Sequence, residues 1–258
     1  IIGVELTLRH ADLGHTHLTL LAEDLRGYGN ICRLITDAHR NSDPEDVALE
    51  PALLAGHTAG IIALSGCREG EIAQLIELGR FDAALTAARR LRDVFGAGNT
   101  FIELQHNLVR GDTQRVARQV ALAEELGLPI VATGNVHYHV RERHRLQDAM
   151  VAVKHRSTLE GSHRLRRPNS EFFLRSPEEM ANVFARYPQA IANTQAISQR
   201  CAGFVLTKHG DIGYTFPDFN RQRDEQHKSA DQVLADNCWA KFDWRYPADI
   251  IKPEDRDK

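Results

Sequence analysis

The first 140 residues alternate between short apolar runs and longer segments in which apolar residues recur every three or four positions. The short runs predict strands at residues 1–8, 17–21, 60–64, 100–104 and 129–133. The longer segments predict helices at residues 24–40, 49–54, 69–78, 81–94 and 112–126. We expect Asp112 to cap the last of these helices and Gly127 to end it. Strands separated by helices of this length predict parallel β-α-β units, so the fold class is α/β, either a barrel or an open sheet.

After residue 140 the pattern becomes mainly helical, with helices predicted at residues 141–153, 177–186, 189–200 and 229–242. Ser176, Pro177 and Glu179 combine an N-cap, a proline in the first turn and a capping-box acid, which is a strong helix start. The polar, turn-rich stretch from 214 to 225 indicates a linker. We therefore expect three parts, at residues 1–140, 141–210 and 211–258.

Composition and charge exclude several classes of protein. Of the 258 residues, 42% are hydrophobic and 26% are charged, and the formal net charge is −3, as in ordinary globular proteins. No apolar run approaches the roughly 18 residues that span a bilayer, so we expect no membrane association. The four cysteines are scattered without a Cys-x-x-Cys pair, which argues against a zinc ribbon or a disulfide framework and fits a reducing cytoplasm. Because the chain opens at Ile1 inside a predicted strand, we expect it to be a piece of a longer protein.

Residues that bind metals cluster at the ends of the predicted strands. Asn135 and His137 follow the strand at 129–133, and two residues that are two apart on a strand face the same way, so they could share a metal or a phosphate. Glu5, His17 and Cys67 also lie at or near strand ends, and this mixture of ligand types suits zinc or manganese. Taken singly, each has a simpler explanation: a solvated carboxylate, a hydrogen-bonded histidine or a small buried thiol.

Two further features bear on function. His106 follows another strand and is an additional candidate ligand, although we favour a polar loop role for it. Residues 141–175 contain nine Lys or Arg against four acids, a balance that suits phosphate contacts or simply a solvated basic face. The chain has no Gly-rich phosphate loop and no Gly-x-Ser-x-Gly. Its single Asp-x-Asp, at residues 255–257, lies in a charged tail, where we do not expect a two-metal phosphoryl-transfer site.

Several motifs resemble, in order, the polymerase-and-histidinol-phosphatase (PHP) domain of bacterial C-family DNA polymerases. They lie at residues 2–5, 17–22, 27–30, 63–67, 101–105 and 131–138, and residues 169–180 are similar to the stretch that follows that domain. Residues 133–139, 162–169 and 213–219 are closer to the error-prone, damage-tolerant branch than to the main replicative subunit. The resemblance covers about residues 1–245, and several motifs in family order make it specific.

The resemblance implies a partial distorted (β/α) barrel of the PHP type, followed by a mainly helical segment. Residues 1–140 would be a PHP domain without its first strands, residues 141–210 a basic helical connection, and residues 211–258 a linker and the start of the polymerase core. In the family's metal site, Glu5, His17, Cys67 and His137 match by position, whereas Asn135 stands in place of an aspartate. An early His-x-His, an Asp and a further His of that site lie N-terminal to this chain. We therefore expect a remnant metal site for Zn²⁺ or Mn²⁺.

The resemblance further implies a parent enzyme that is an error-prone DNA-directed DNA polymerase, a nucleotidyltransferase acting in translesion synthesis and in replication associated with DNA repair. It would use primer-template DNA, deoxynucleoside triphosphates and Mg²⁺, and its catalytic palm would lie outside this chain, which alone should be inactive. We expect Arg164, Arg166 and Arg167 to contact nucleic acid. Two alternatives stay open: a metal-dependent phosphoesterase or 3′-5′ exonuclease of the PHP type, and a docking module for other DNA-damage-response proteins.

Overall fold

The computed structural model describes residues 1–203, 205 and 228–247. By internal contacts the chain divides into two units, residues 1–206 and residues 207–258. The first unit therefore contains the helices up to residue 201 together with the sheet. The functional division at residues 140 and 210 stays a prediction.

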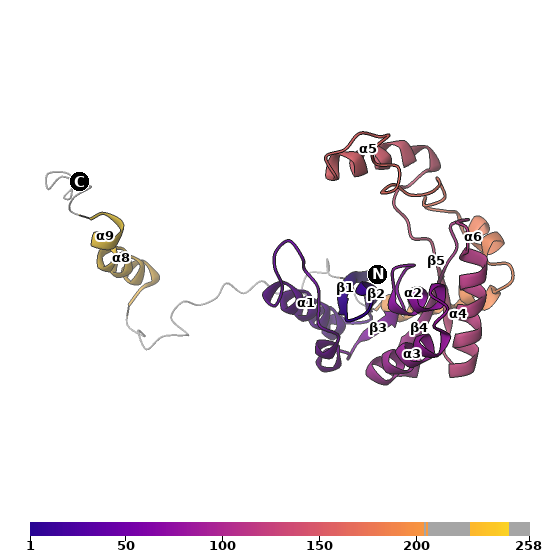
Figure 1. Ribbon diagram of the computed structural model, residues 1–258. Coiled ribbons are helices and arrows are strands. Elements are labelled where there is room, and N and C mark those ends of the chain that lie inside the picture. The colour runs from indigo at the N-terminus through magenta and orange to yellow at the C-terminus, as the bar shows by residue number, and fades with distance from the viewer. Residues whose placement is uncertain (204, 206–227, 248–258) are drawn as a thin grey trace. The chain divides into compact units, whose positions relative to one another are not determined.

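A five-stranded mixed sheet forms the centre of the first unit (Figure 1). Its strands lie in sequence order: β1 (Ile2–His10), β2 (Gly14–Ala22), β3 (Ile61–Leu64), β4 (Thr100–Gln105) and β5 (Ile130–Thr133). The first two form an antiparallel hairpin, β2 pairs antiparallel with β3, and the last three are parallel. The predicted α/β class is confirmed, and the parallel units are those of β3 to β5.

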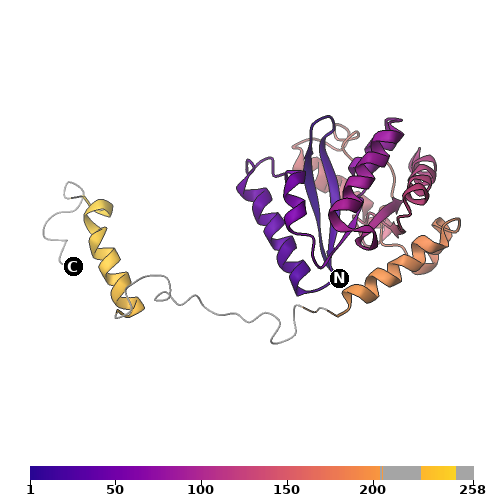
Figure 2. The same cartoon turned by 90° about the horizontal axis from the view of Figure 1, so that it is seen from below.

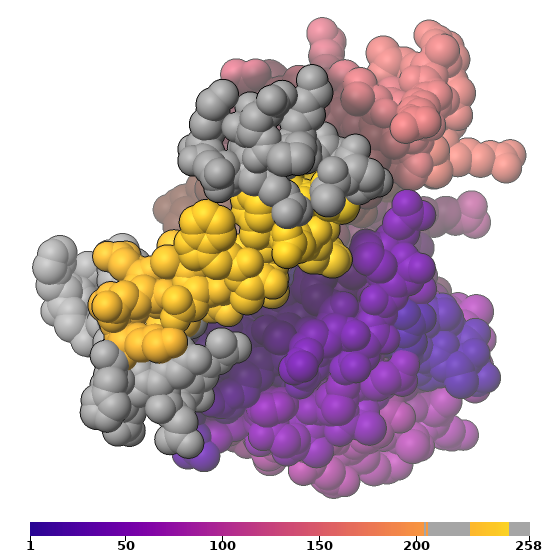
Figure 3. All heavy atoms as spheres, turned by 90° about the vertical axis from the view of Figure 1, so that its left-hand side faces the viewer, coloured from indigo at the N-terminus to yellow at the C-terminus, as the bar shows by residue number. Residues whose placement is uncertain are grey.

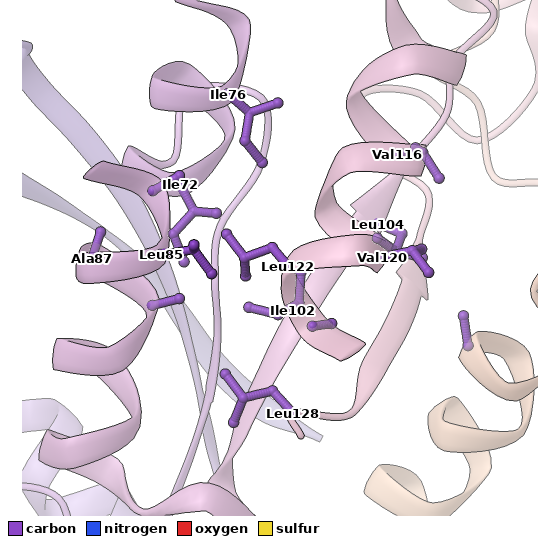
Figure 4. Close-up of a cluster of buried hydrophobic side chains, with 14 of the residues drawn as sticks. Ile72, Ile76, Leu85, Ala87, Ile102, Leu104, Val116, Val120, Leu122 and Leu128 are labelled. Carbon is purple, nitrogen blue, oxygen red and sulfur yellow. The ribbon is translucent and has the colours of Figure 1, made fainter. Parts of the chain in front are cut away.

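The described helices of the first unit are α1 (Leu25–Arg40), α2 (Glu71–Glu77), α3 (Phe81–Phe95), α4 (Asp112–Leu126), α5 (His144–Lys154), α6 (Pro177–Val183) and α7 (Pro188–Cys201), with 3-10 turns η1 (Pro51–Gly56), η2 (Ala97–Asn99) and η3 (Arg141–Arg143). Helices pack on both faces of the sheet, but α5 lies away from it (Figure 1). Figures 1 and 2 show α1 lying along the β1–β2 hairpin. Helices α2, α3 and α4 pack on one face of β4 through residues that include Ile102 and Leu104 (Figure 4).

Helix α7 packs against the opposite face of the sheet. Its Ile197 and Cys201 contact Ile62, Phe101 and Val131. Because side chains alternate along a strand, β3 and β4 bury residues on both faces, which explains the continuous apolar character of β3. Polar contacts hold α7 in place as well: Arg200 pairs with both carboxylate oxygens of Glu23 at 2.9 and 3.0 Å, and Asn193 donates to the Ile130 carbonyl at 2.7 Å.

The sequence predicts the capping residues correctly at the start of α6 and wrongly at the start of α4. The capping box of α6 is present, since Ser176 accepts from the Glu179 N–H and Glu179 accepts from the Ser176 N–H. The predicted Asp112 cap is wrong, because Gly111 is the N-cap of α4, with φ +93°. The Asp112 carboxylate instead accepts from the backbone N–H groups of Asn107 and Val109, at 2.8 and 3.0 Å, and so organises the preceding loop.

In the second unit the structure describes residues 228–247, drawn in orange to yellow in Figure 3. They form α8 (Ala230–Ala240) and α9 (Phe242–Arg245), where a single helix over 229–242 is expected from the sequence. Ser229 and Gln232 form a capping box at the start of α8. The ring of Phe242 lies 5.6 Å from that of Trp239 and 5.3 Å from that of Tyr246. None of the helices in the described parts of the chain is long and apolar enough to cross a membrane.

Candidate metal site and adjoining basic cavity

Three potential metal ligands converge where β1, β2 and the loop after β3 meet. In the hairpin, Glu5 lies opposite Thr19 and Thr7 lies opposite His17, so Glu5 and His17 are diagonal neighbours on one face. Cys67 reaches them because Gly66 turns the chain with φ +89°, and a Cβ at this position would lie 2.1 Å from the His17 carbonyl oxygen. The ligand atoms of Glu5, His17 and Cys67 lie within 4.8 Å of one another.

The donor set of this triad suits a zinc-like ion. The Nδ1 atom of His17 lies 3.3 Å from Cys67 Sγ and 3.3 Å from Glu5 Oε1, and its Nε2 atom lies 3.6 Å from an oxygen of Glu69. Imidazole, thiolate and carboxylate are the ligands that zinc takes in proteins. The three side chains therefore fit a metal ion by chemistry and by spacing.

The thiol of Cys67 is protonated at neutral pH. Burial raises the pKa of Cys67 to about 12, and the nearby negative charges of Glu5 and Glu69 act in the same direction. The Glu69 N–H, 3.4 Å from the sulfur, opposes this by stabilising the thiolate. A cation bound to the thiolate would displace this proton, so binding should depend on pH.

Asn135 and His137 line the same cavity as the triad, which has a volume of about 130 Å³. The expectation that they share a face of a strand is wrong, because β5 ends at Thr133 and Asn135 has φ +47°, a left-handed conformation that Asn tolerates. This turn brings Asn135 Oδ1 to 3.1 Å from His137 Nε2. The structure thus gathers all five candidate ligands, and their role as ligands stays a prediction.

The surroundings of His137 favour the neutral form of its imidazole. Burial lowers the pKa of His137, the positive charge of Arg167 lowers it further, and Glu69 opposes both. The backbone N–H of His137 donates to the Phe172 carbonyl at 2.8 Å, which fixes the loop to the segment that follows α5. A neutral imidazole is the form that binds metal ions.

Glu103 is a buried carboxylate behind this cavity that the sequence motifs alone do not single out. It is 4% exposed, and its Oε1 accepts from Thr133 and from Gln105, at 2.5 and 2.9 Å. Its Oε2 has no hydrogen-bond partner among the described residues. Burial raises the pKa of Glu103, the two hydrogen bonds oppose the shift, and the charge of Glu5 adds to it. The available signal was an acid in the middle of an otherwise apolar strand.

A buried ion pair forms one wall of the cavity. Arg115 donates to Asp112 and to Glu77, both at 2.8 Å, and to the Gln105 carbonyl at 3.0 Å. Arg115 is 4% exposed and Asp112 is 2% exposed. His106, the additional candidate, does not line the cavity. Its Nε2 lies 3.1 Å from Thr113 Oγ1, as the polar loop role requires.

The basic segment at residues 141–175 forms an adjoining cavity. Arg166 pairs with Asp148 at 2.9 Å, whereas Arg164 is exposed. The guanidinium of Arg167 lies 5.2 Å from the centre of the Phe172 ring and lines both cavities. Glu171 pairs with Arg141 and with Arg175. Part of the positive charge of this segment is therefore neutralised internally.

Comparison with known proteins identifies the family. Residues 1–107 match the family model of the PHP domain. The chain is 39% identical over 217 residues to the error-prone DNA polymerase of Symbiobacterium thermophilum, covering 78% of this chain and 20% of that protein. It is 35% identical over 185 residues to DNA polymerase III subunit alpha of Treponema pallidum, and 36% identical over 199 residues to that of Thermus aquaticus. These matches cover 72% and 74% of this chain and 16% of each relative.

The sheet, the convergent ligands and the matched family model define a PHP-type α/β domain. More particularly, the chain belongs to the PHP-containing part of bacterial C-family DNA polymerases, so the expected family is confirmed. The chain spans about a fifth or less of the length of these relatives.

Proposed function

We propose that this chain is part of an error-prone DNA polymerase that extends primers across damaged template bases. The observation that supports it is the 39% identity over 217 residues to a protein named error-prone DNA polymerase. The catalytic palm would lie outside this chain. The parent enzyme would use deoxynucleoside triphosphates and Mg²⁺ in two-metal phosphoryl transfer.

Primer extension by the protein that contains this chain tests the proposal. The templates would be identical except for one abasic site, and a replicative alpha subunit would serve as the reference enzyme. We expect extension past the lesion and a raised error rate on undamaged template. Accurate copying with arrest at the lesion would contradict an error-prone role and favour a replicative one.

Within this polymerase, residues 1–140 would act as a scaffold and residues 141–175 would face the DNA. Arg164 and Arg167 have no ion pair in the part of the chain that the structure describes, so their charges are available to phosphates. Charge reversal of both should weaken primer-template binding and reduce the salt slope by about two units. Reversal of Arg166 should act mainly through its pair with Asp148. An unchanged salt slope in the Arg164/Arg167 variant would contradict the contact.

The triad supports a second candidate function, a metal-dependent phosphoesterase or 3′-5′ exonuclease. Glu5, His17 and Cys67 would hold Zn²⁺ or Mn²⁺, with His137 beside them. A bound ion would polarise a phosphoryl oxygen. Asn135 stands where the family resemblance places an aspartate, so the site has one negative charge fewer.

Elemental analysis of the purified protein with and without Cys67→Ser tests metal binding, and a 3′-labelled single strand in Mn²⁺ tests hydrolysis. The second candidate predicts metal and nuclease activity that are both lost in Cys67→Ser. A metal content below about 0.2 ions per chain together with no hydrolysis would contradict this candidate and leave the site as a structural remnant. Metal content without hydrolysis would assign the ion a structural role.

A further inference from the structure

The basic cavity is built from side chains that point to a particular ligand. It has a volume of about 770 Å³, within the range of small-ligand sites, and lies between α5 and the loop at residues 157–170. Its charged and imidazole side chains are those of His144, Asp148, His163, Arg164, Arg166 and Arg167. Three guanidinium groups against one carboxylate leave an excess of positive charge.

Arg166 is fixed by two partners at once. Its Nη1 donates to Asp148 Oδ2 at 2.9 Å, and its Nη2 contacts His163 Nδ1 at 3.3 Å. A guanidinium can only donate, so Nδ1 of His163 is the acceptor in this contact and Nε2–H is the donor that the ring presents. The Asp148–Arg166 pair thus orients the His163 ring.

Arg164 and Arg167 supply the charge that remains. Neither has an ion pair among the described residues, whereas Arg166 is matched by Asp148. Arg167 stacks over Phe172, which restrains its guanidinium beside the metal-site cavity. The cavity therefore combines two unneutralised guanidinium groups with one oriented imidazole N–H.

We propose that this cavity binds a phosphate group of nucleic acid, an inference that rests on the proposed polymerase function. Arg164, Arg167 and His163 Nε2–H are the donors, and Arg166 is a positioning residue that orients His163. Guanidinium groups bind phosphate oxygens in bidentate fashion, and a third donor at a different angle suits a tetrahedral anion better than a planar carboxylate. Because Arg167 lines both cavities, the bound phosphate lies at the border of the metal site.

Fluorescence anisotropy of the 258-residue chain with a labelled single-stranded oligonucleotide tests the proposal. Four probes separate the possible ligands: the oligonucleotide with a 5′-phosphate, the same strand without it, a strand with central methylphosphonate linkages, and an oligoglutamate peptide. Tighter binding of the first probe assigns a terminal phosphate, and weaker binding of the third assigns a backbone phosphodiester. Either result supports the proposal. Equal binding of oligoglutamate would overturn it in favour of an acidic peptide.

The variants separate the donors from the positioning residue. We expect Arg164→Ala, Arg167→Ala and His163→Ala each to weaken binding by about tenfold, the size of one hydrogen bond to a charged group. His163→Gln keeps a donor at the position of Nε2 and should stay within about threefold of the parent chain. Arg166→Met should weaken binding as much as His163→Ala does, and the double variant should be no weaker than either. Arg145→Ala, an exposed arginine of α5 outside the cavity, is the control for net charge.

Two results would overturn the assignment: parent-like binding by His163→Ala, or equal losses in His163→Ala and His163→Gln. Thermal melting of each variant shows whether it is folded, and the Gln variant keeps the test valid if the Ala variant is unstable. Primer extension by the protein that contains this chain is measured in parallel. Extension past lesions with parent-like phosphate binding by His163→Ala would reject the cavity assignment alone. Absent extension with intact, His163-dependent phosphate binding would reject the polymerase role alone.

Discussion

Arg167 lines both cavities, but the two cavities differ in how far their ionisable side chains are exposed to solvent. In the metal-site cavity, burial shifts the pKa values of the Cys67 thiol and the His137 imidazole in the direction that favours their neutral forms. In the basic cavity, Arg164 is exposed and keeps its charge. The first is built from the β1–β2 hairpin, where Glu5 and His17 lie in mid-strand and not at the expected strand ends, together with the loops after β3, β4 and β5. The second is built from a helix and a loop. Burial thus prepares one cavity for a cation that displaces protons, and exposure leaves the other open to anions.

The largest expected effect is on the free energy of unfolding, and it should differ between Arg115, which is paired in the metal-site cavity, and Arg166, which is paired in the basic cavity. Arg115→Met should destabilise the fold by about 3–5 kcal/mol, because it leaves the buried Asp112 carboxylate without its countercharge. Arg166→Met should cost only about 1 kcal/mol, since its pair with Asp148 is partly exposed. Urea denaturation measures both.

Arg118→Met, at an exposed position of α4, is the control and should stay within about 0.5 kcal/mol of the parent chain. Equal losses in the Arg115 and Arg166 variants would show that burial does not distinguish the two cavities.

Zinc affinity should depend on pH through Cys67. If the thiol loses its proton on binding, the apparent affinity should rise about tenfold per pH unit between pH 6 and 8. Cys67→Ser should lower the affinity at least about 100-fold and flatten this slope. Competition with a zinc-binding dye measures both quantities. Cys201→Ser, at a buried position on α7, is the matched control, and the same slope in both variants would exclude Cys67 as the ligand that loses a proton.

The sequence predicts the strands and helices of the first unit well, because β3, β4 and β5 are short, mostly apolar runs between segments of helical periodicity. It is less informative about how the site is assembled. Asn135 and His137 meet through a left-handed turn rather than through the pleat of a strand, and φ at a single Asn cannot be read from local pattern. The pairing of Arg166 with Asp148 spans 18 positions and depends on the fold of the loop between them.

Glu103 offers a test of the buried cavity through the pH dependence of stability. Since burial raises its pKa in the folded state above the ordinary value near 4.3, the folded state binds the proton more tightly than the unfolded state. The contribution of protonated Glu103 to the free energy of unfolding is fully present below the pKa of the unfolded state. It is lost as pH rises through the pKa of the folded state. Glu103→Gln keeps the shape of the protonated acid and should remove this loss.

Urea denaturation of parent and Glu103→Gln at pH 4 and pH 8 measures this difference. We expect similar stability at pH 4 and a variant more stable by about 1–2 kcal/mol at pH 8, the cost of a buried polar group without a partner. Glu124→Gln, an exposed position of α4, should show no such pH dependence. If the Glu103→Gln chain is less stable than the parent at pH 8, the ionised carboxylate makes a stabilising interaction in the folded state.

The smallest effect should appear at Arg167, the arginine that lines both cavities. Removing the positive charge in Arg167→Gln should raise the pKa of His137, because that charge now disfavours the imidazolium. Burial, the larger cause, remains, so the pKa should stay below its ordinary value. An NMR titration of the His137 ring protons measures the change, with Arg164→Gln as the control that should leave it unaltered. An unchanged His137 pKa in Arg167→Gln would show that the charge of the basic cavity does not reach the metal site, and that a phosphate on Arg167 could not influence the protonation of His137.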